Sequence, residues 1–437
     1  MAKIKSSIRL LDLFECIFVF FCLAIGVLLN NVLFSGVGIA IALLLFVCSN
    51  DLQVFGFLAF FTPNTAIVVL TNGGMGLLGF FYLLFGLKLY LLKRRNHKIS
   101  MSSCLMVVVL LVICLSRILN ANVYDFAIMI QTVSAIGVWT YAAKKYDIEA
   151  KIRIILYFIF GAIFMLIGMI IQVPLAAETR IAGLLDDPNY TGGVFCVLFA
   201  IALLSFCYKL AIKKSFLLML IAVLGGVLTG SRGFLLSVAC VVCCYLLVGL
   251  KNKNARKVFS LVCIAIIGFF ALYFIKVPLA VTLYDNTIGR TLQLSQNHQS
   301  GNFMDITSGR MVLWEFYLDK ISSSVSLALF GRGFAGYELP ANGGYGLAAH
   351  NAYIGGIMGI GVIGLLLIVI LYWRIYQAGT KGKNHLVVLS IVIGIAVNYF
   401  FLDGLLDLRV SLYVFLGGCF KEIYSSFRTP NLSNGSR

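Results

Sequence analysis

Apolar segments recur along the whole chain and are separated by short polar stretches. Each runs for about 17 to 25 residues, the length that an α-helix needs to cross a bilayer. The pattern therefore predicts an all-α membrane protein with about 12 to 14 transmembrane helices, whose ends carry an error of a few residues. We expect spans near residues 12–29, 32–49, 53–70, 75–92, 102–119, 123–142, 152–172, 190–208, 214–230, 233–250, 258–280, 350–373, 385–402 and 406–421.

Clusters of lysine and arginine lie between these segments and test the count of spans. Every cluster follows an even number of predicted crossings. Because membrane proteins concentrate lysine and arginine in cytoplasmic loops, the alternation predicts that both termini are cytoplasmic. No small-residue cleavage site follows the basic N-terminus, so we expect an uncleaved first span. The clusters are Lys3, Lys5 and Arg9; Lys93, Arg94 and Arg95; Lys144, Lys145 and Lys151; Lys209, Lys213 and Lys214; Lys251, Lys253, Arg256 and Lys257; Arg374, Lys381 and Lys383; and Lys421 and Arg428.

Two of the predicted outer loops are long. One covers residues 173–189, and the other covers residues 281–349 and is the longest polar stretch of the chain. Within the second, segment 309–324 has apolar residues at helical spacing, which predicts a short amphipathic helix on the membrane surface. These residues are Val312, Trp314, Phe316, Leu318 and Ile321. The glycine-rich segment 331–346 is typical of a loop.

Composition agrees with a membrane protein and excludes other classes. The chain of 437 residues is 61% hydrophobic and 12% charged, with a mean hydropathy of +1.00. Its net charge of +17 is divided among short clusters and forms no continuous basic face, which argues against nucleic-acid binding. We see no internal repeat of the kind found in many transporters, so residues 1–437 are interpreted as a single integral membrane domain.

Arginine is the main basic residue on the predicted outer side, whereas lysine predominates inside. Topology alone gives no reason for this difference. The guanidinium group offers a planar fork of donors that fits a phosphate or a carboxylate, so the set predicts anion binding. Any single arginine can instead extend to lipid headgroups, and that interpretation stays open for each of them. The outer arginines are Arg117, Arg180, Arg232, Arg290, Arg310, Arg332 and Arg409.

Two short motifs carry candidate chemistry. Arg232 lies in the turn 229–233, of sequence Thr-Gly-Ser-Arg-Gly, where glycine lets a ligand approach the backbone closely. His350 and Asn351 begin a predicted span at its outer end. A neutral imidazole there can take a proton from an attacking hydroxyl, which predicts a catalytic or substrate role for His350. The alternative is a histidine that only caps a helix.

Acidic and aromatic residues accompany the arginines. Residues 186, 187 and 189 (Asp, Asp and Asn) flank Pro188 before a span, and they are either a helix cap or substrate ligands. Asp403, Asp407 and Arg409 lie in the last outer turn, where Asp407 either pairs with Arg409 or holds a sugar hydroxyl. The candidates for a surface on which sugar rings stack are Tyr337, Tyr345 and Tyr353.

Several signatures are absent from the sequence. There is no P-loop, no Asp-x-Asp motif, no G-x-S-x-G elbow and no H-E-x-x-H motif, so nothing indicates ATP, a nucleotide sugar or zinc. The 12 cysteines lie mostly in apolar segments, and we expect free thiols. Cys240, Cys243 and Cys244 have a metal-like spacing, but no histidine or carboxylate accompanies them. We therefore expect no metal and no cofactor.

Five motifs in order resemble the O-antigen ligase and polymerase superfamily, over roughly residues 170–410. The motifs are Arg180 with Asp187-Pro188-Asn189, Ser231-Arg232-Gly233, Ser308-Gly309-Arg310 with Trp314, Gly331-Arg332-Gly333, and His350-Asn351-x-Tyr353. Members of this superfamily handle oligosaccharides linked to undecaprenyl diphosphate in the bacterial cytoplasmic membrane.

The resemblance implies a GT-C-like fold and a metal-independent glycosyltransferase whose leaving group is a lipid diphosphate. Preorganised arginines would stabilise the charge that grows on this group in the transition state. By the same resemblance, Arg180 and Arg232 bind the diphosphate, and His350 positions or deprotonates the acceptor hydroxyl. Arg310 and Arg332 hold the donor or shape the outer cavity. The other implied substrate ligands are Asp187, Asn189, Asn351 and Tyr353.

Three functions remain open. The first is a polymerase that joins lipid-linked repeat units of an O-antigen or capsular polysaccharide, and we favour it. The second is a ligase that moves the finished glycan to another acceptor. The third is a flippase or other transporter, which would place charged residues inside the spans, whereas most spans here have an apolar interior. The expected partners are the lipid-linked oligosaccharide, membrane lipids, a flippase and a chain-length regulator, with no nucleic acid.

Overall fold

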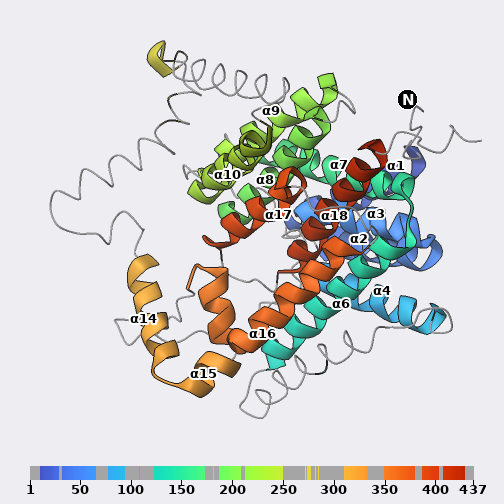
Figure 1. Ribbon diagram of the computed structural model, residues 1–437. Helices are drawn as coiled ribbons and strands as arrows, with labels where there is room; N and C mark the ends of the chain where they lie inside the picture. The colour runs from blue at the N-terminus through green and yellow to red at the C-terminus, as the bar shows by residue number, and fades with distance from the viewer. Residues whose placement is uncertain are drawn as a thin grey trace, which may run out of the picture.

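The computed structural model describes residues 10–28, 32–64, 77–93, 108, 123–172, 181, 187–207, 212–249, 271, 273–276, 281, 284, 310–332, 349–378, 386–402 and 407–428. Within these ranges the chain is α-helical and contains no β-strand, which confirms the predicted all-α class (Figure 1). The described helices are α1 (Leu10–Leu28), α2 (Val32–Cys48), α3 (Asp51–Phe61), α4 (Leu77–Lys93), α6 (Val123–Lys145), α7 (Ile148–Gln172), α8 (Pro188–Cys207), α9 (Ile212–Leu228), α10 (Arg232–Gly249), α14 (Arg310–Ser322), α15 (Val325–Phe330), α16 (Ala352–Gln377), α17 (Leu386–Tyr399) and α18 (Leu408–Arg428).

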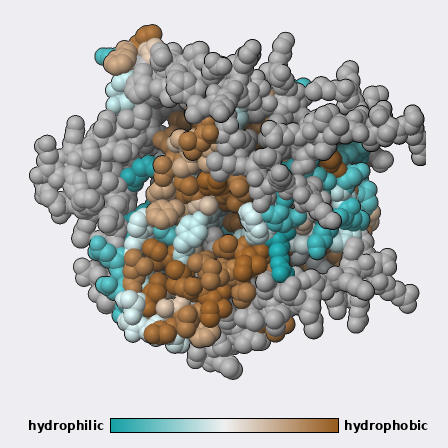
Figure 2. Space-filling model, in the orientation of Figure 1, coloured by the Kyte–Doolittle hydropathy of each residue, from teal (hydrophilic) through white to brown (hydrophobic). Residues whose placement is uncertain are grey.

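Three described helices are long and apolar enough to cross a membrane. They cover Ile148–Gln172, Pro188–Phe206 and Ala352–Gln377. Shorter apolar helices accompany them, and many large apolar side chains face outward, such as Leu33 and Val47, which are 73% and 74% exposed. Figure 2 shows apolar surface over the region of α10 and α16. Such a surface suits lipid and not water, so the chain is a membrane protein.

Helices from distant parts of the sequence pack against each other. α8 packs on α9, α10 and α17, while α17 also packs on α18, so the middle and the end of the chain lie side by side (Figure 1). α16 and α18 continue this bundle to α6, and α3 packs on α7. One continuous apolar core runs through these helices, with Trp139, Phe158 and Phe415 among its fully buried side chains. The packing brings the ends of α8, α10, α16, α17 and α18 near one another.

Helix α3 ends earlier than the apolar pattern predicts. The predicted span runs to residue 70, whereas α3 stops at Phe61 and a short turn follows to Asn64. The Thr62 hydroxyl donates to the Leu58 carbonyl, and the Asn64 amide donates to the carbonyls of Phe60 and a neighbouring helix. The Leu58 carbonyl also accepts from the Thr62 backbone amide, the Asn64 bonds join the last turn of α3 to α7, and Pro63 disfavours continuation of the helix.

Helix α16 is broken at Gly361, which the predicted uninterrupted span at 350–373 did not anticipate. Gly361 has φ 72° and ψ 172°, so the two parts of α16 meet at an angle (Figure 1). Gly331, which follows α15, also has a positive φ of 71°. A Cβ at Gly331 would lie 2.5 Å from the Gly359 carbonyl carbon, and one at Gly361 would meet the Leu329 carbonyl. Backbone therefore packs directly on backbone where α15 meets α16.

The segment 309–324, predicted to form a short amphipathic helix, is helical as α14, but its buried face is not the predicted one. Leu313 and Tyr317 are buried, whereas Leu318, predicted to lie on the apolar face, is 49% exposed. Tyr317 packs with Ala349 and Met358 in a small cluster separate from the main core. The contact with the start of α16 therefore fixes the rotation of α14.

Lysines pair with acidic or amide side chains at the ends of the bundle that the sequence predicts to be cytoplasmic. Two of these lysines are buried, and a buried ammonium group needs such a partner because it has lost its water. The pairs, which join α6 to α3, α7 to α18 and α18 to α16, are Lys145–Asp51, Lys151–Glu422 and Lys421–Gln377. They connect residues that the predicted topology assigns to the same side.

Candidate functional site

The first turns of α8 and α10 are joined by a buried hydrogen bond. The Ser231 hydroxyl donates to Asn189 Oδ1 at 2.9 Å, and both side chains are almost completely buried. Asp187 caps α8, because its carboxylate accepts from the Asn189 amide at 2.7 Å, and Pro188 occupies the first helical position. The capping interpretation of Asp187 is therefore confirmed, and Asn189 has a structural partner.

Arg232 is the first residue of α10 and follows a tight turn. Gly230 has φ 59°, which permits the reversal, and the Ser231 amide donates to Thr229 Oγ1 at 3.1 Å. Ser231 Oγ accepts from the Phe234 amide at 3.3 Å and so caps α10. The Arg232 side chain is half-buried. A cap on one side and the bond to α8 on the other thus fix the backbone that carries the guanidinium.

Asn398 lies between these two helices near the end of α17. Its side chain is fully buried, and within the described ranges neither amide atom has a hydrogen-bond partner. A Cβ at Gly193 would lie 2.7 Å from Asn398 Oδ1, and one at Gly233 would lie 3.5 Å from Nδ2. The amide therefore fills the space that glycine leaves open on α8 and α10. Asn398 was not predicted from the sequence, although a polar side chain within a predicted span was the signal for it.

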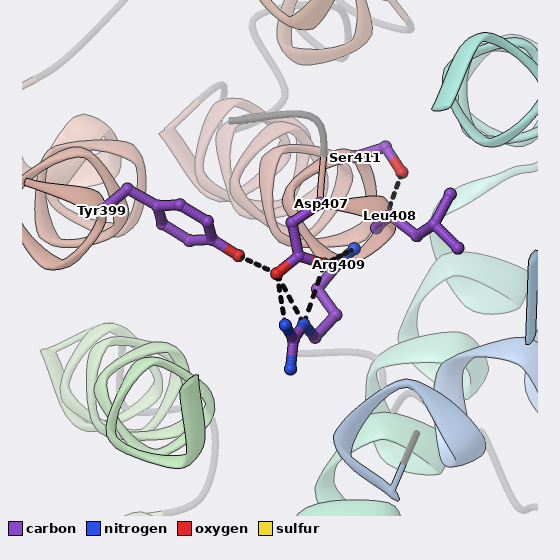
Figure 3. Close-up of polar contacts among 5 residues, drawn as sticks. All are labelled: Tyr399, Asp407, Leu408, Arg409 and Ser411. Atoms are coloured by element: carbon purple, nitrogen blue, oxygen red, sulfur yellow. Dashed lines mark hydrogen bonds and ion pairs between the residues drawn. The ribbon is translucent and has the colours of Figure 1, made fainter. Parts of the chain in front are cut away.

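Asp407 and Arg409 form an ion pair at the start of α18 (Figure 3). Arg409 Nε lies 2.8 and 2.7 Å from the two oxygens of Asp407, and Nη2 lies 2.6 Å from Oδ2. The Tyr399 hydroxyl donates to the same carboxylate at 2.7 Å. The guanidinium carbon lies 4.0 Å from the centroid of the Tyr190 ring. Of the two interpretations offered for Asp407, pairing with Arg409 is the one observed.

His350 precedes α16 in a left-handed backbone conformation, with φ 47°. Asn351 is the N-cap, because its side chain accepts from the amides of Tyr353 and Ile354 at 3.0 and 3.1 Å. Capping of α16 is thus performed by Asn351 and not by His350, whose side chain is half-buried. The Tyr353 hydroxyl donates to the Ala396 carbonyl on α17 at 2.8 Å, so the ring is held against that helix.

Trp314 connects α14 to the residue before His350. Its indole N–H donates to the Ala349 carbonyl at 2.9 Å, and its ring meets Phe400 edge-on with centroids 5.2 Å apart. Arg310 begins α14 one turn earlier and shares a helix face with Trp314. Arg332 is exposed, and its backbone amide donates to the Met358 carbonyl at 2.7 Å.

The end of α17 therefore connects the two groups of candidate residues. Gly233, next to Arg232, packs on Phe401 and Asn398, while Trp314, bonded beside His350, packs on Phe400. The helix starts of α8, α10 and α18 meet at the Asn189–Ser231 and Arg409–Tyr190 contacts. Asp187 and Asp407 already place carboxylates at the starts of α8 and α18, whereas α10 is capped by the neutral Ser231, so the partial positive charge that favours a negatively charged ligand lies at the start of α10.

Several predicted residues lie outside the described ranges. These are Arg117, Arg180, Asp186, Arg290, Tyr337, Tyr345 and Asp403. Ile181, which follows Arg180 in the sequence, is described: it is buried, and its amide donates to the Leu228 carbonyl at the end of α9. In the described part of the chain, no group of three or more His, Cys, Asp or Glu side chains converges, and the described cysteines are free thiols.

Comparison with known proteins identifies one segment. Residues 217–369 match the family model described as O-Antigen ligase, which agrees with the resemblance to the O-antigen ligase and polymerase superfamily. No curated protein matches the chain. The matched segment is less than half of the chain, and Asp187, Asn189 and Arg409 lie outside it. The candidate residues within it are Arg232, Arg310, Arg332, His350, Asn351 and Tyr353.

Proposed function

We propose that this chain, whose residues 217–369 form an O-antigen ligase family segment, is a glycosyltransferase that joins undecaprenyl-diphosphate-linked repeat units. It would work at the outer face of a bacterial cytoplasmic membrane as one GT-C-like domain with 12 to 14 spans and cytoplasmic termini. The long stretch 281–349 would form its large outer loop. The observation that carries the proposal is that contacts beside Arg232 and beside His350 both converge on the end of α17.

In the proposed reaction, Arg232 and His350 have separate roles. The acceptor hydroxyl attacks the anomeric carbon of the donor, the bond from that carbon to the diphosphate oxygen breaks, and the proton passes to His350. Charge grows on the departing diphosphate, and Arg232 at the start of α10 meets it together with the positive end of that helix. Arg180, Arg310 and Arg332 are proposed to assist with the donor, and no metal ion is needed.

The remaining candidates receive supporting roles in this proposal. Asn351 and Tyr353 hold the start of α16, and with it His350, against α17. Asp187 and Asn189 hold the start of α8 against the turn before Arg232. We propose that they act on the substrate through this placement. The same arrangement would serve an O-antigen ligase, because the two reactions differ only in the acceptor. The description of the matching family model favours this second function.

Purified protein tests the proposal directly. The full chain in nanodiscs is given lipid-linked oligosaccharide extracted from cells that lack this protein, and the products are separated by length. We expect longer chains on the lipid, also in the presence of a metal chelator. Transfer only to an added non-repeat acceptor would favour the ligase. Absence of any transfer by the folded protein would contradict the glycosyltransferase proposal and support a transporter.

Two substitutions then test the assigned residues. Arg232→Ala and His350→Ala should each lower the rate by about 10²- to 10³-fold, the usual effect of removing a transition-state donor or a general base. Arg153→Ala is the matched control, because its ion-pair partner within the described ranges is Glu149 on the same helix, at the opposite end of the bundle. Normal products from both variants would show that the site assignment is wrong.

A further inference from the structure

The Asp407–Arg409 pair has a binding capacity that the proposed reaction does not use. Asp407 accepts from Tyr399, from the Arg409 backbone amide and from two guanidinium nitrogens. One edge of the Arg409 guanidinium is therefore occupied, and one face lies on Tyr190. Within the described ranges, no acceptor contacts Nη1, the third guanidinium nitrogen, and Figure 3 shows one amino group directed away from Asp407.

The burial of the pair argues against the two ordinary explanations for it. The side chains of Arg409 and Asp407 are only 11% and 9% exposed, so this arginine does not extend into lipid headgroups. A buried ion pair is also a poor source of stability, because apolar residues of similar volume usually serve as well. Within the described ranges, Nη1 is not sealed off as a buried atom without a partner, so a ligand can reach this free edge of the guanidinium and supply an acceptor.

The charge of the pair indicates which ligand it fits. The carboxylate neutralises the guanidinium, so the pair offers a directed donor with little net positive charge, unlike Arg232. The position is also distinct, because Arg409 touches Tyr190 while the neighbouring Asn189 bonds to Ser231, next to Arg232. A donor of this kind, beside an aromatic ring, suits an oxygen of a neutral sugar better than a diphosphate.

We infer that Arg409, held by Asp407 and Tyr190, binds the sugar that adjoins the diphosphate of the donor. Nη1 donates to a hydroxyl or carbonyl oxygen of that sugar, while Arg232 faces the diphosphate. Asp407 and Tyr399 are positioning residues that hold the guanidinium. This inference rests on the proposed function, because it assigns the sugar and the diphosphate of one lipid-linked substrate to two neighbouring arginines.

The test compares two lipids on the same protein. Binding of undecaprenyl diphosphate without sugar, and of the extracted lipid-linked oligosaccharide, is measured for the full chain in nanodiscs. The variant combines Asp407→Leu with Arg409→Met, which replaces the pair by apolar groups. We expect its Kd for the oligosaccharide lipid to rise by about 10- to 100-fold, the worth of a hydrogen bond to a charged group, with the Kd for undecaprenyl diphosphate unchanged.

Other outcomes would overturn the inference in recognisable ways. Unchanged binding of both lipids would show that the pair is only structural, and equal weakening of both would assign Arg409 to the diphosphate. If the wild-type chain bound neither lipid, the proposed function itself would be contradicted and the inference with it. If the double variant fails to fold, Arg409→Lys keeps the charge beside Asp407 but removes the planar fork. The same selective loss is expected of it, and unaltered selectivity would refute the inference.

Discussion

The Ser231 hydroxyl donates a 2.9 Å hydrogen bond to Asn189 Oδ1 and so fixes the start of α10 against the start of α8. The two residues are 42 positions apart in the chain. Ser231 Oγ also accepts from the Phe234 amide, so one side chain both caps α10 and joins it to α8. Because Arg232 is the next residue, this bond fixes the position of the backbone from which the Arg232 side chain extends.

Removal of the Ser231 hydroxyl should therefore destabilise the protein. Ser231→Ala leaves the buried Asn189 oxygen without its donor, which costs about 1–3 kcal/mol, and also removes a helix cap. Thermal unfolding in detergent measures the loss. Ser237→Ala is the matched control, because Ser237 is also fully buried on α10 but donates to the Gly233 carbonyl of its own helix and contacts the Cys196 thiol of α8, so its loss removes no helix cap and strands no amide oxygen. Equal melting temperatures for the two variants would contradict this account of Ser231.

The break in α16 requires glycine at position 361. Gly361→Ala places a Cβ against the Leu329 carbonyl and strains a residue with φ 72°, and a strained backbone of this kind costs about 1–3 kcal/mol before the clash is counted. We expect a lower melting temperature and lower activity, since the break sets the direction of the half of α16 that begins beside His350. Gly355→Ala in the same helix is the control.

Gly355 is helical, and a Cβ there meets nothing within 4 Å. Alanine is the better helix former by about 0.5–1 kcal/mol, so Gly355→Ala should be neutral or stabilising where it faces open space. A Gly361→Ala variant that melted at the same temperature as Gly355→Ala would show that α16 accommodates a continuous helix.

Features that depend on residues close together in the chain, or on a regular apolar period, could be predicted from the sequence. The spans at 152–172 and 190–208 match α7 and α8 to within a few residues, because apolar length is a local property. The Asp187 cap and the pairing of Asp407 with Arg409 were also foreseen as alternatives, since each partner lies two residues away. Local chemistry alone was enough to propose these contacts.

Contacts between distant segments were not predictable in the same way. Helix α16 carries glycine at 355, 356, 359, 361 and 364, and composition does not tell which of them has the positive φ. That choice is made by the carbonyl of Leu329 on α15. Likewise, nothing near Asn398 in the sequence indicates Gly193, which is brought to it by the packing of α8 on α17.

The close approach of Asn398 to Gly193 predicts a compensating pair of substitutions. Gly193→Ala places a methyl group 2.7 Å from Asn398 Oδ1, and such overpacking costs about 1–3 kcal/mol. Adding Asn398→Ala makes room for that methyl group. The double variant should therefore melt at a higher temperature than Gly193→Ala alone, and a double-mutant cycle measures the coupling. Additive losses would show that the amide does not fill this space.

The bond from Trp314 to the Ala349 carbonyl predicts a variant that separates positioning from stability. Trp314→Phe keeps a ring for the edge-on contact with Phe400 but removes the N–H donor, whose net contribution to stability is about 0.5–1.5 kcal/mol. Ala349 immediately precedes His350, so loss of the bond should loosen the imidazole relative to the acceptor. A displacement of about 1 Å near a reacting group can cost as much as 10²-fold in rate.

We therefore expect the turnover rate of Trp314→Phe to fall more than its melting temperature would suggest. Binding of undecaprenyl diphosphate should remain near the wild-type value, because the Ser231 bond to α8 fixes the start of α10, which carries Arg232. Trp373→Phe is the matched control, since Trp373 is 43% exposed and its stacking partner among the described rings is Tyr376, on the part of α16 beyond the break at Gly361. If the two variants lost turnover to the same extent, the effect would be general weakening of the fold, and the route from Trp314 to His350 would be wrong.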